Sequence, residues 1–215
     1  MPLTLPVLLL LFLVLGLQFD LMTFSFEKLG LSHDSAVLLL FTALFCGLIN
    51  LPLFSVAAEA PEEPSDPREF GMWRSPRMPF TGRTLIAVNV GGCLVPLAFS
   101  AYLITHKPLP LEQLLPAVAA MSALSYVFSR PIAGLGIAMP GLVAPLCAAL
   151  VALLLADEAF RAEIAYIAGT TGVLIGADLL RLKDIRRMGA PIASIGGAGT
   201  FDGIFMTGLV AALLT

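Results

Sequence analysis

Two stretches near the carboxyl end decide the fold that this sequence predicts. Residues 164–180 read IAYIAGTTGVLIGADLL, and residues 189–215 read GAPIASIGGAGTFDGIFMTGLVAALLT. Both are long and apolar enough to enter a bilayer, because a membrane-crossing helix needs about 20 mostly apolar residues. Each also holds an acid, Asp178 or Asp202, that costs about 2.5–3.5 kcal/mol or more at the bilayer centre. The two stretches therefore predict a membrane protein with a polar site inside it.

The composition of the whole chain agrees with a lipid environment. Of its 215 residues, 58% are hydrophobic and 13% are charged, whereas a soluble domain averages about 45–50% and about 25%. We therefore expect an all-α fold, a polytopic transmembrane helical bundle forming a single domain over residues 1–215. The net charge of −3 and the lack of a basic run argue against a nucleic-acid partner. Three scattered cysteines predict no metal site, and nothing in the sequence calls for a cofactor.

Seven apolar stretches are candidates for membrane spans. They are residues 3–19, 36–56, 85–105, 111–128, 137–156, 164–180 and 189–215. The longest polar segment between them, residues 57–84, contains five prolines and changes from acidic to basic. That composition predicts an irregular cytoplasmic loop rather than a second domain.

The basic residues predict how these spans are oriented. With seven spans and a cytoplasmic amino end, the cytoplasmic loops hold nine Lys and Arg residues and the opposite loops hold three. The nine are Arg68, Arg74, Arg77, Arg83, Arg130, Arg181, Lys183, Arg186 and Arg187, and the three are Lys28, Lys107 and Arg161. Cytoplasmic loops carry the excess of positive charge. We therefore expect a multi-pass protein of a prokaryotic inner membrane, with the carboxyl end outside.

A glycine-rich segment interrupts the last apolar stretch. Four glycines, at 196, 197, 199 and 203, are hard to keep in one continuous helix. Lipid cannot satisfy the freed backbone groups, so the segment must be buried in protein or line a wet cavity. We expect a broken or re-entrant segment here, with Asp202 as the amino-terminal cap of the last helix.

The same segment supplies the candidate site. Asp178 and Asp202 are the expected catalytic pair, because a short turn would make their two helices antiparallel neighbours. The expected substrate- or ion-binding residues are Gly196, Gly197, Gly199, Thr200, Gly203 and Asn89.

These motifs resemble those of a known family. The runs 172–180 and 189–205, together with 89–92 and 136–140, are similar to an uncharacterised family of bacterial and archaeal multi-pass membrane proteins, a domain of unknown function numbered sixteen-fourteen. The resemblance implies a membrane protein and assigns no activity. A weaker similarity links Gly176-Ala177-Asp178 to the Gly-x-Gly-Asp motif of presenilin-type and prepilin-peptidase-type intramembrane aspartyl proteases.

Three functions remain open at this point. An Asp178/Asp202 dyad that shares one proton could hydrolyse a membrane-embedded peptide. A broken helix with a buried acid at Asp202 is also typical of a cation or proton transporter. Finally, Asp202 could be only a helix cap, with Asp178 paired to Arg181, in a protein that scaffolds a partner in the lipid bilayer.

Overall fold

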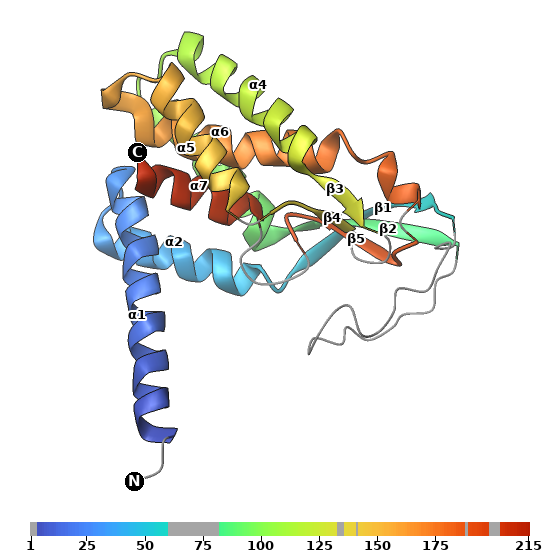
Figure 1. Cartoon of the computed structure of the whole chain (residues 1–215), viewed down its shortest axis with the longest axis horizontal. Coiled ribbons are helices and arrows are strands. Elements are labelled where there is room, and N and C mark those ends of the chain that lie inside the picture. Colours follow the sequence, from blue (N-terminus) through green and yellow to red (C-terminus); the bar gives the residue numbers. More distant parts are fainter. Residues whose placement is uncertain (1–3, 60–81, 133–135, 141, 188, 198–202) are drawn as a thin grey trace.

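The computed structural model describes residues 4–59, 82–132, 136–140, 142–187, 189–197 and 203–215. Most of these residues are helical (Figure 1). The α-helices are α1 (Thr4–Lys28), α2 (His33–Cys46), α3 (Val95–His106), α4 (Leu111–Phe128), α5 (Val143–Leu155), α6 (Arg161–Val173) and α7 (Gly203–Leu214). Two π-helical segments, η1 (Val90–Leu94) and η3 (Leu174–Leu179), precede α3 and extend α6; two 3-10 turns are η2 (Glu158–Phe160) and η4 (Asp184–Arg187).

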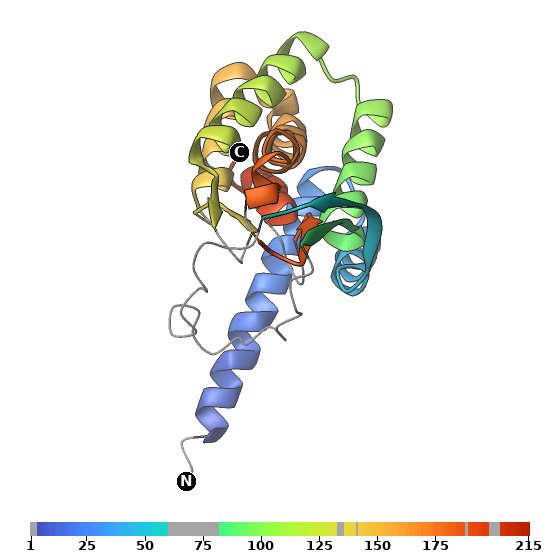
Figure 2. The ribbon, with the colours of Figure 1, turned by 90° about the vertical axis from the view of Figure 1, so that its right-hand side faces the viewer.

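Helix α6 is the centre of the bundle. Figure 2 shows it beside α7, with α4 and α5 on one side and α3 on the other. Of the most apolar 18-residue stretch within Glu158–Leu179, which contains α6 and η3, 72% is buried inside the protein. The corresponding share for α4 is 28%. Figure 1 shows α6 running toward the sheet and α7 running back from it, so the two helices are antiparallel.

Small residues set the spacing of these helices. A Cβ atom on Gly169 would lie 3.2 Å from the Cα of Gly208 in α7. A Cβ on Gly172 would lie 2.7 Å from the side chain of Met121 in α4. One on Gly176 would overlap the backbone oxygen of Ser122. Close backbone approach at glycine is how helices pack in membranes, where no hydrophobic force drives them together.

Two helices of the described chain are long and apolar enough to cross a membrane. They are Leu111–Phe128 and the continuous run Glu158–Leu179. A third candidate is the pair Leu15–Lys28 and His33–Cys46, if these two segments, bent by 117°, form one span. Large apolar side chains such as Leu142 and Leu154 are three-quarters exposed, as expected for a surface that faces lipid. The fold is compatible with a membrane protein.

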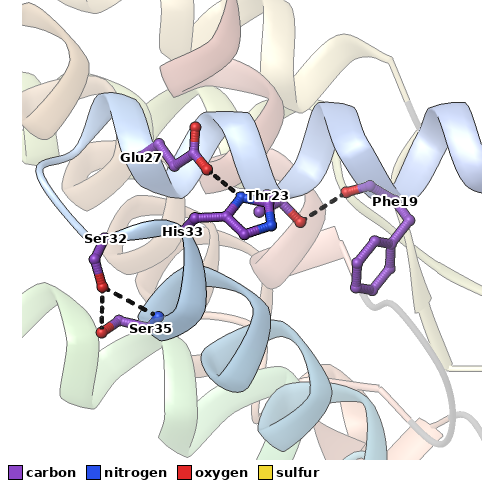
Figure 3. A network of polar contacts seen from close by, with 6 residues as sticks. All are labelled: Phe19, Thr23, Glu27, Ser32, His33 and Ser35. Atoms are coloured by element: carbon purple, nitrogen blue, oxygen red, sulfur yellow. Dashed lines mark hydrogen bonds and ion pairs between the residues drawn. The ribbon is translucent and has the colours of Figure 1, made fainter.

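The bend between α1 and α2 contains polar contacts that were not predicted. Gly30 has φ +94°, a left-handed conformation that glycine adopts without strain. Ser32 then caps α2, accepting a hydrogen bond from the backbone N–H of Ser35 at 3.3 Å (Figure 3). His33 contacts Glu27 across the corner, with Nδ1 2.6 Å from Oε1. His33 is therefore a surface histidine with an acidic neighbour.

A small sheet at one end of the bundle was not predicted. It has the order β1-β2-β5, formed by β1 (Asn50–Ala57), β2 (Arg83–Asn89) and β5 (Ile192–Ile195). β1 pairs with β2 in antiparallel fashion, whereas β2 and β5 are parallel. A separate hairpin pairs β3 (Arg130–Ile132) with β4 (Gly136–Ala138).

The expectation of seven helical spans is not confirmed. The helical class holds, and stretches 111–128 and 164–180 are helices over almost their whole length. Stretches 36–56, 85–105, 137–156 and 189–215 are each part strand and part helix. Apolar content alone does not distinguish a buried strand from a helix. Pro52 cannot sit inside a helix without breaking it, and the alternating Thr84, Ile86 and Val88 favour a strand.

The glycine packing gives a first prediction. Replacing Gly176 with Ala places a methyl group against the backbone of α4, which should lower stability by about 1–3 kcal/mol and reduce the unfolding temperature in detergent. Gly16→Ala is the matched control, since nothing lies within 4 Å of a Cβ there, and it should leave the unfolding temperature unchanged or raise it. Equal stability of the Gly176→Ala variant and the wild type would contradict the packing described.

Candidate membrane-embedded site

The parallel strands β2 and β5 end side by side. The glycine-containing segments that follow them, η1 and the turn at Gly196, therefore lie in contact. The last β2–β5 pair is Val88 with Ile195. Beyond it, β2 continues into Asn89 and η1, and β5 continues into Gly196. Carboxyl ends of parallel strands are where ligands bind in open sheets. This edge of the sheet is therefore the structural counterpart of the glycine-rich site expected from sequence.

Asn89 holds this edge together. Its side chain is fully buried, and its Nδ2 donates to the carbonyl oxygen of Gly47 at 2.7 Å and to Oδ1 of Asn50 at 3.2 Å. Its Oδ1 accepts from the backbone N–H of Gly92 at 2.7 Å, which caps η1. Ser194 of β5 adds a hydrogen bond from its Oγ to the same Asn50 oxygen at 2.5 Å. Asn89 therefore positions the backbone around the site.

Glycine is required where η1 meets the segment after β5. A Cβ on Gly92 would overlap the carbonyl oxygen of Gly196, and a Cβ on Gly196 would lie 2.5 Å from that of Cys93. Gly196 and Gly197 have φ of +81° and +84°, values that other residues adopt only with strain. At these two residues strand β5 ends in a turn, whereas the sequence predicted a broken helix over a segment that lies mostly outside the described residues. Asn89, Gly196 and Gly197 are neighbours, as parts of one junction.

Three expected site residues, Gly199, Thr200 and Asp202, lie outside the described residues. Gly203 is the first residue of α7. Asn50 and Ser194 belong to the junction and were not among the expected site residues. Their roles depend on the pairing of strands far apart in sequence, for which the sequence holds no local signal.

Asp178 lies in η3, and its side chain is half-buried. Twelve residues separate it from Tyr166, so an unbroken α-helix would place it about 120° around the axis from Tyr166. A π-helical turn takes up about one extra residue and so turns the following residues back by roughly 100°. The π segment thus brings Asp178 onto nearly the same face as Tyr166 and Thr170. That face meets α7, since a Cβ on Gly208 would lie 3.1 Å from the backbone oxygen of Tyr166.

Arg181 is engaged by other groups. It forms an ion pair with Asp184 at 3.1 Å and donates hydrogen bonds to Ser129 Oγ at 2.7 Å and to the carbonyl oxygen of Tyr126 at 2.6 Å. Its guanidinium also lies 4.4 Å from the Tyr126 ring centre. Among the ion pairs of the described residues, Arg181 is the partner of Asp184.

The opposite end of the bundle holds a different set of charges. Lys107 pairs with the buried Glu163 at the start of α6, with Nζ 3.2 Å from Oε1. Lys28 donates to the last carbonyl oxygens of α7, at 3.2 Å to Ala212 and 3.3 Å to Leu213. Lysine is favourable at a helix carboxyl end. The basic residues of the predicted outer loops therefore gather at this end, whereas Arg181 and the sheet lie at the other.

A metal centre finds no support in the described part of the chain. No group of three or more His, Cys, Asp or Glu side chains there is placed to hold a metal ion. The polar donors at the junction are amide, hydroxyl and backbone groups.

The role of Asn89 is tested by its removal. Asn89→Ala leaves the buried Gly92 N–H and Gly47 carbonyl without their partner, which should cost about 1–3 kcal/mol for each group and lower the unfolding temperature in detergent. Asn50→Ala is the comparison, because it removes only the longest of the Asn89 bonds, 3.2 Å, at an exposed position, and it should lower the unfolding temperature less. A smaller effect of Asn89→Ala than of Asn50→Ala would refute this assignment.

Comparison with known proteins yields one match. Residues 44–214 match the family described as "Protein of unknown function (DUF1614)". The match spans the sheet, the Asn89 junction, and every helix from the end of α2 to α7. No curated protein and no solved structure matches the chain. Because the match covers well over half of the sequence, the chain belongs to the DUF1614 family of proteins of unknown function.

Proposed function

We propose that the protein is an intramembrane aspartyl peptidase in which Asp178 and Asp202 form the catalytic pair. The observation that carries this proposal is the antiparallel contact of α6 with α7 at Gly169 and Gly208. Asp178 is nine residues beyond Gly169, about 13 Å along the axis, and Gly203 is five residues before Gly208, about 8 Å. Asp178 and the first residue of α7 therefore differ in level by only about 6 Å, and Asp202 is the residue next to Gly203 in sequence.

Two carboxyl groups held close together supply the chemistry of peptide hydrolysis. Like charges a few ångströms apart cannot both ionise easily, so the pair keeps one proton. The ionised carboxylate removes a proton from water, and the protonated one donates a hydrogen bond to the scissile carbonyl. The water oxygen then forms the new bond to carbon, and the amine leaves with a proton returned by the pair. The substrate is a membrane-embedded peptide, whose extended backbone needs hydrogen-bonding groups that lipid lacks.

The junction at Asn89 supports this assignment. The junction fixes Gly196, at the start of the glycine-rich segment, against η1. The packing of α7 against α6 fixes Gly203, at the end of that segment. A reacting pair has to be held within about 0.5 Å of its productive geometry by rigid elements.

Loss of the acids tests the activity. Purified protein in detergent should cleave a hydrophobic single-span peptide, and Asp178→Asn or Asp202→Asn should abolish cleavage, since each leaves the pair without its shared proton. Asp20→Asn is the matched control, because Asp20 is an exposed acid on α1, and it should keep full activity. Cleavage that survives Asp178→Asn or Asp202→Asn would rule out the dyad. Absence of cleavage combined with stabilisation by an added cation would favour an ion site instead.

The distribution of basic residues supports an orientation with the sheet on the cytoplasmic side of an inner membrane. Arg83, Arg130 and Arg181 belong to the sheet end, and Lys28 and Lys107 to the opposite end. Excess Lys and Arg stay in the cytoplasm, which also corresponds to a cytoplasmic amino end and an external carboxyl end.

Thiol labelling tests the orientation in bacterial cells. In a variant without native cysteines, Glu158→Cys should react with a membrane-impermeant maleimide in intact cells. Lys183→Cys should react only after permeabilisation. Both positions are exposed, so the difference reports the side of the membrane. The reverse pattern of labelling would invert the proposed orientation.

A further inference from the structure

A line of polar side chains runs along one face of the central helix. In an ideal α-helix, Glu163 would lie about 60° and Thr170 about 40° around the axis from Tyr166. Allowing for the π segment η3, Asp178 would lie within about 30° of Tyr166. Without that segment Asp178 would lie on a different face. We call these side chains the α6 polar line: Glu163, Tyr166, Thr170 and Asp178.

Two hydroxyl groups in this line are buried without a hydrogen bond. Tyr166 and Thr170 have no exposed surface. The Thr170 side chain lies beside the Tyr166 hydroxyl, one helical turn away. However, neither Tyr166 Oη nor Thr170 Oγ1 makes a hydrogen bond of good geometry. An unsatisfied buried hydroxyl destabilises the folded protein, because it loses its hydrogen bonds to water. Buried polar groups of this kind are the usual partners of ordered internal water.

The ring of Tyr166 is held by an aromatic cluster. Its centre lies 5.2 Å from that of Phe99 and 6.3 Å from that of Phe26. Phe205 of α7 joins the same cluster through Phe26, at 6.1 Å. Phenylalanine would keep these ring contacts and remove only the hydroxyl, so Tyr166→Phe isolates the polar group.

Both ends of the line carry acids. Glu163 is 6% exposed and is bonded to Lys107, whose side chain is 36% exposed and so reaches the surface. Asp178 ends the line near the sheet. The 15 residues from Glu163 to Asp178 cover about 22 Å at 1.5 Å per residue, roughly three-quarters of a hydrocarbon core of about 30 Å. Chains of acids and hydroxyls at such depths mark proton relays.

We propose that the α6 polar line is a proton path between the Lys107–Glu163 pair and Asp178, and that the protein moves protons across the membrane. In each step, an oxygen accepts one proton and passes another proton to the next group. The charge of each relaying group is therefore unchanged after the transfer. Glu163 takes up the proton from water, Tyr166 Oη and Thr170 Oγ1 relay it, and the Asp178 carboxylate receives it. The proposal does not depend on peptide hydrolysis.

The interval between Thr170 and Asp178 is the gate of this path. It covers about 12 Å and contains Val173, which is 4% exposed, and Ala177, which is 5% exposed. Protons cross an apolar constriction only when water enters it. The path should therefore conduct slowly and in response to a driving force.

Proton flux into vesicles tests the proposal. The full chain is reconstituted into liposomes that contain a pH-sensitive dye, and a potassium gradient with valinomycin sets the membrane potential. Wild-type protein should acidify the interior faster than protein-free liposomes. Tyr166→Phe, Thr170→Val and Glu163→Gln should each lower the rate by about tenfold or more.

Matched variants separate the path from a structural effect. Thr171→Val changes the adjacent threonine, whose hydroxyl already donates to the Ile167 carbonyl, and it should conduct like the wild type. Tyr102→Phe, on an exposed ring, is the control for Tyr166→Phe. Thr170→Ser restores a hydroxyl and should restore the flux. Wild-type flux equal to that of empty liposomes, or undiminished flux in Tyr166→Phe and Thr170→Val, would overturn the proposal. Peptide cleavage by the Asp178→Asn and Asp202→Asn variants is a separate measurement from proton flux. The peptidase proposal and the proton-path proposal can therefore fail independently.

Discussion

The close approach of α6 to its neighbours is the constraint on which the rest of the structure depends. Lipid provides no hydrophobic force between helices, so packing and polar contacts have to hold the bundle together. Gly169 and Gly208 let α6 and α7 touch, and Gly172 and Gly176 let α4 approach from another side. The face of α6 that carries Tyr166 and Thr170 is consequently enclosed by protein, and Asp178 lies half-buried at its end. Any function assigned to Asp178 depends on that enclosure.

The two π-helical segments are placed where this architecture needs them. η3 rotates Asp178 toward the face of α6 that meets α7, and η1 starts α3 at the junction held by Asn89. Such segments are rare, occur mostly as single turns inside α-helices, and are frequent at functional sites. Here both lie beside glycines that permit contact with another element, Gly176 with α4 and Gly92 with Gly196. The sheet, the junction and the carboxyl end of α6 thus form one polar region at one end of the bundle, opposite the Lys107–Glu163 pair.

The sequence predicted the helical class and the contact between α6 and α7, because each depends on local composition or short connections. It did not predict the sheet. β2 and β5 are paired across more than 90 residues, and apolar runs such as 85–105 look like spans whether they fold as helices or begin as strands. For the same reason, the sequence did not identify Asn50 and Ser194 as site residues. They join the Asn89 hydrogen-bond network only after the strands pair. The π segments also leave no signal in the sequence, so the orientation of Asp178 could not be derived before the structure was known.

The peptidase requires that Asp178 and Asp202 lie side by side, and a disulfide between these two positions tests that contact. In a chain with Cys46, Cys93 and Cys147 changed to Ala, Asp178→Cys and Asp202→Cys are combined and exposed to a mild oxidant in membranes. Disulfides form only when the Cα atoms come within about 7 Å. The control combines Asp202→Cys with Thr171→Cys, a position about 10 Å further along α6. We expect rapid, near-complete bridging of 178 with 202 and little bridging of 171 with 202. Bridging of 178 with 202 that is no faster than the control would contradict it.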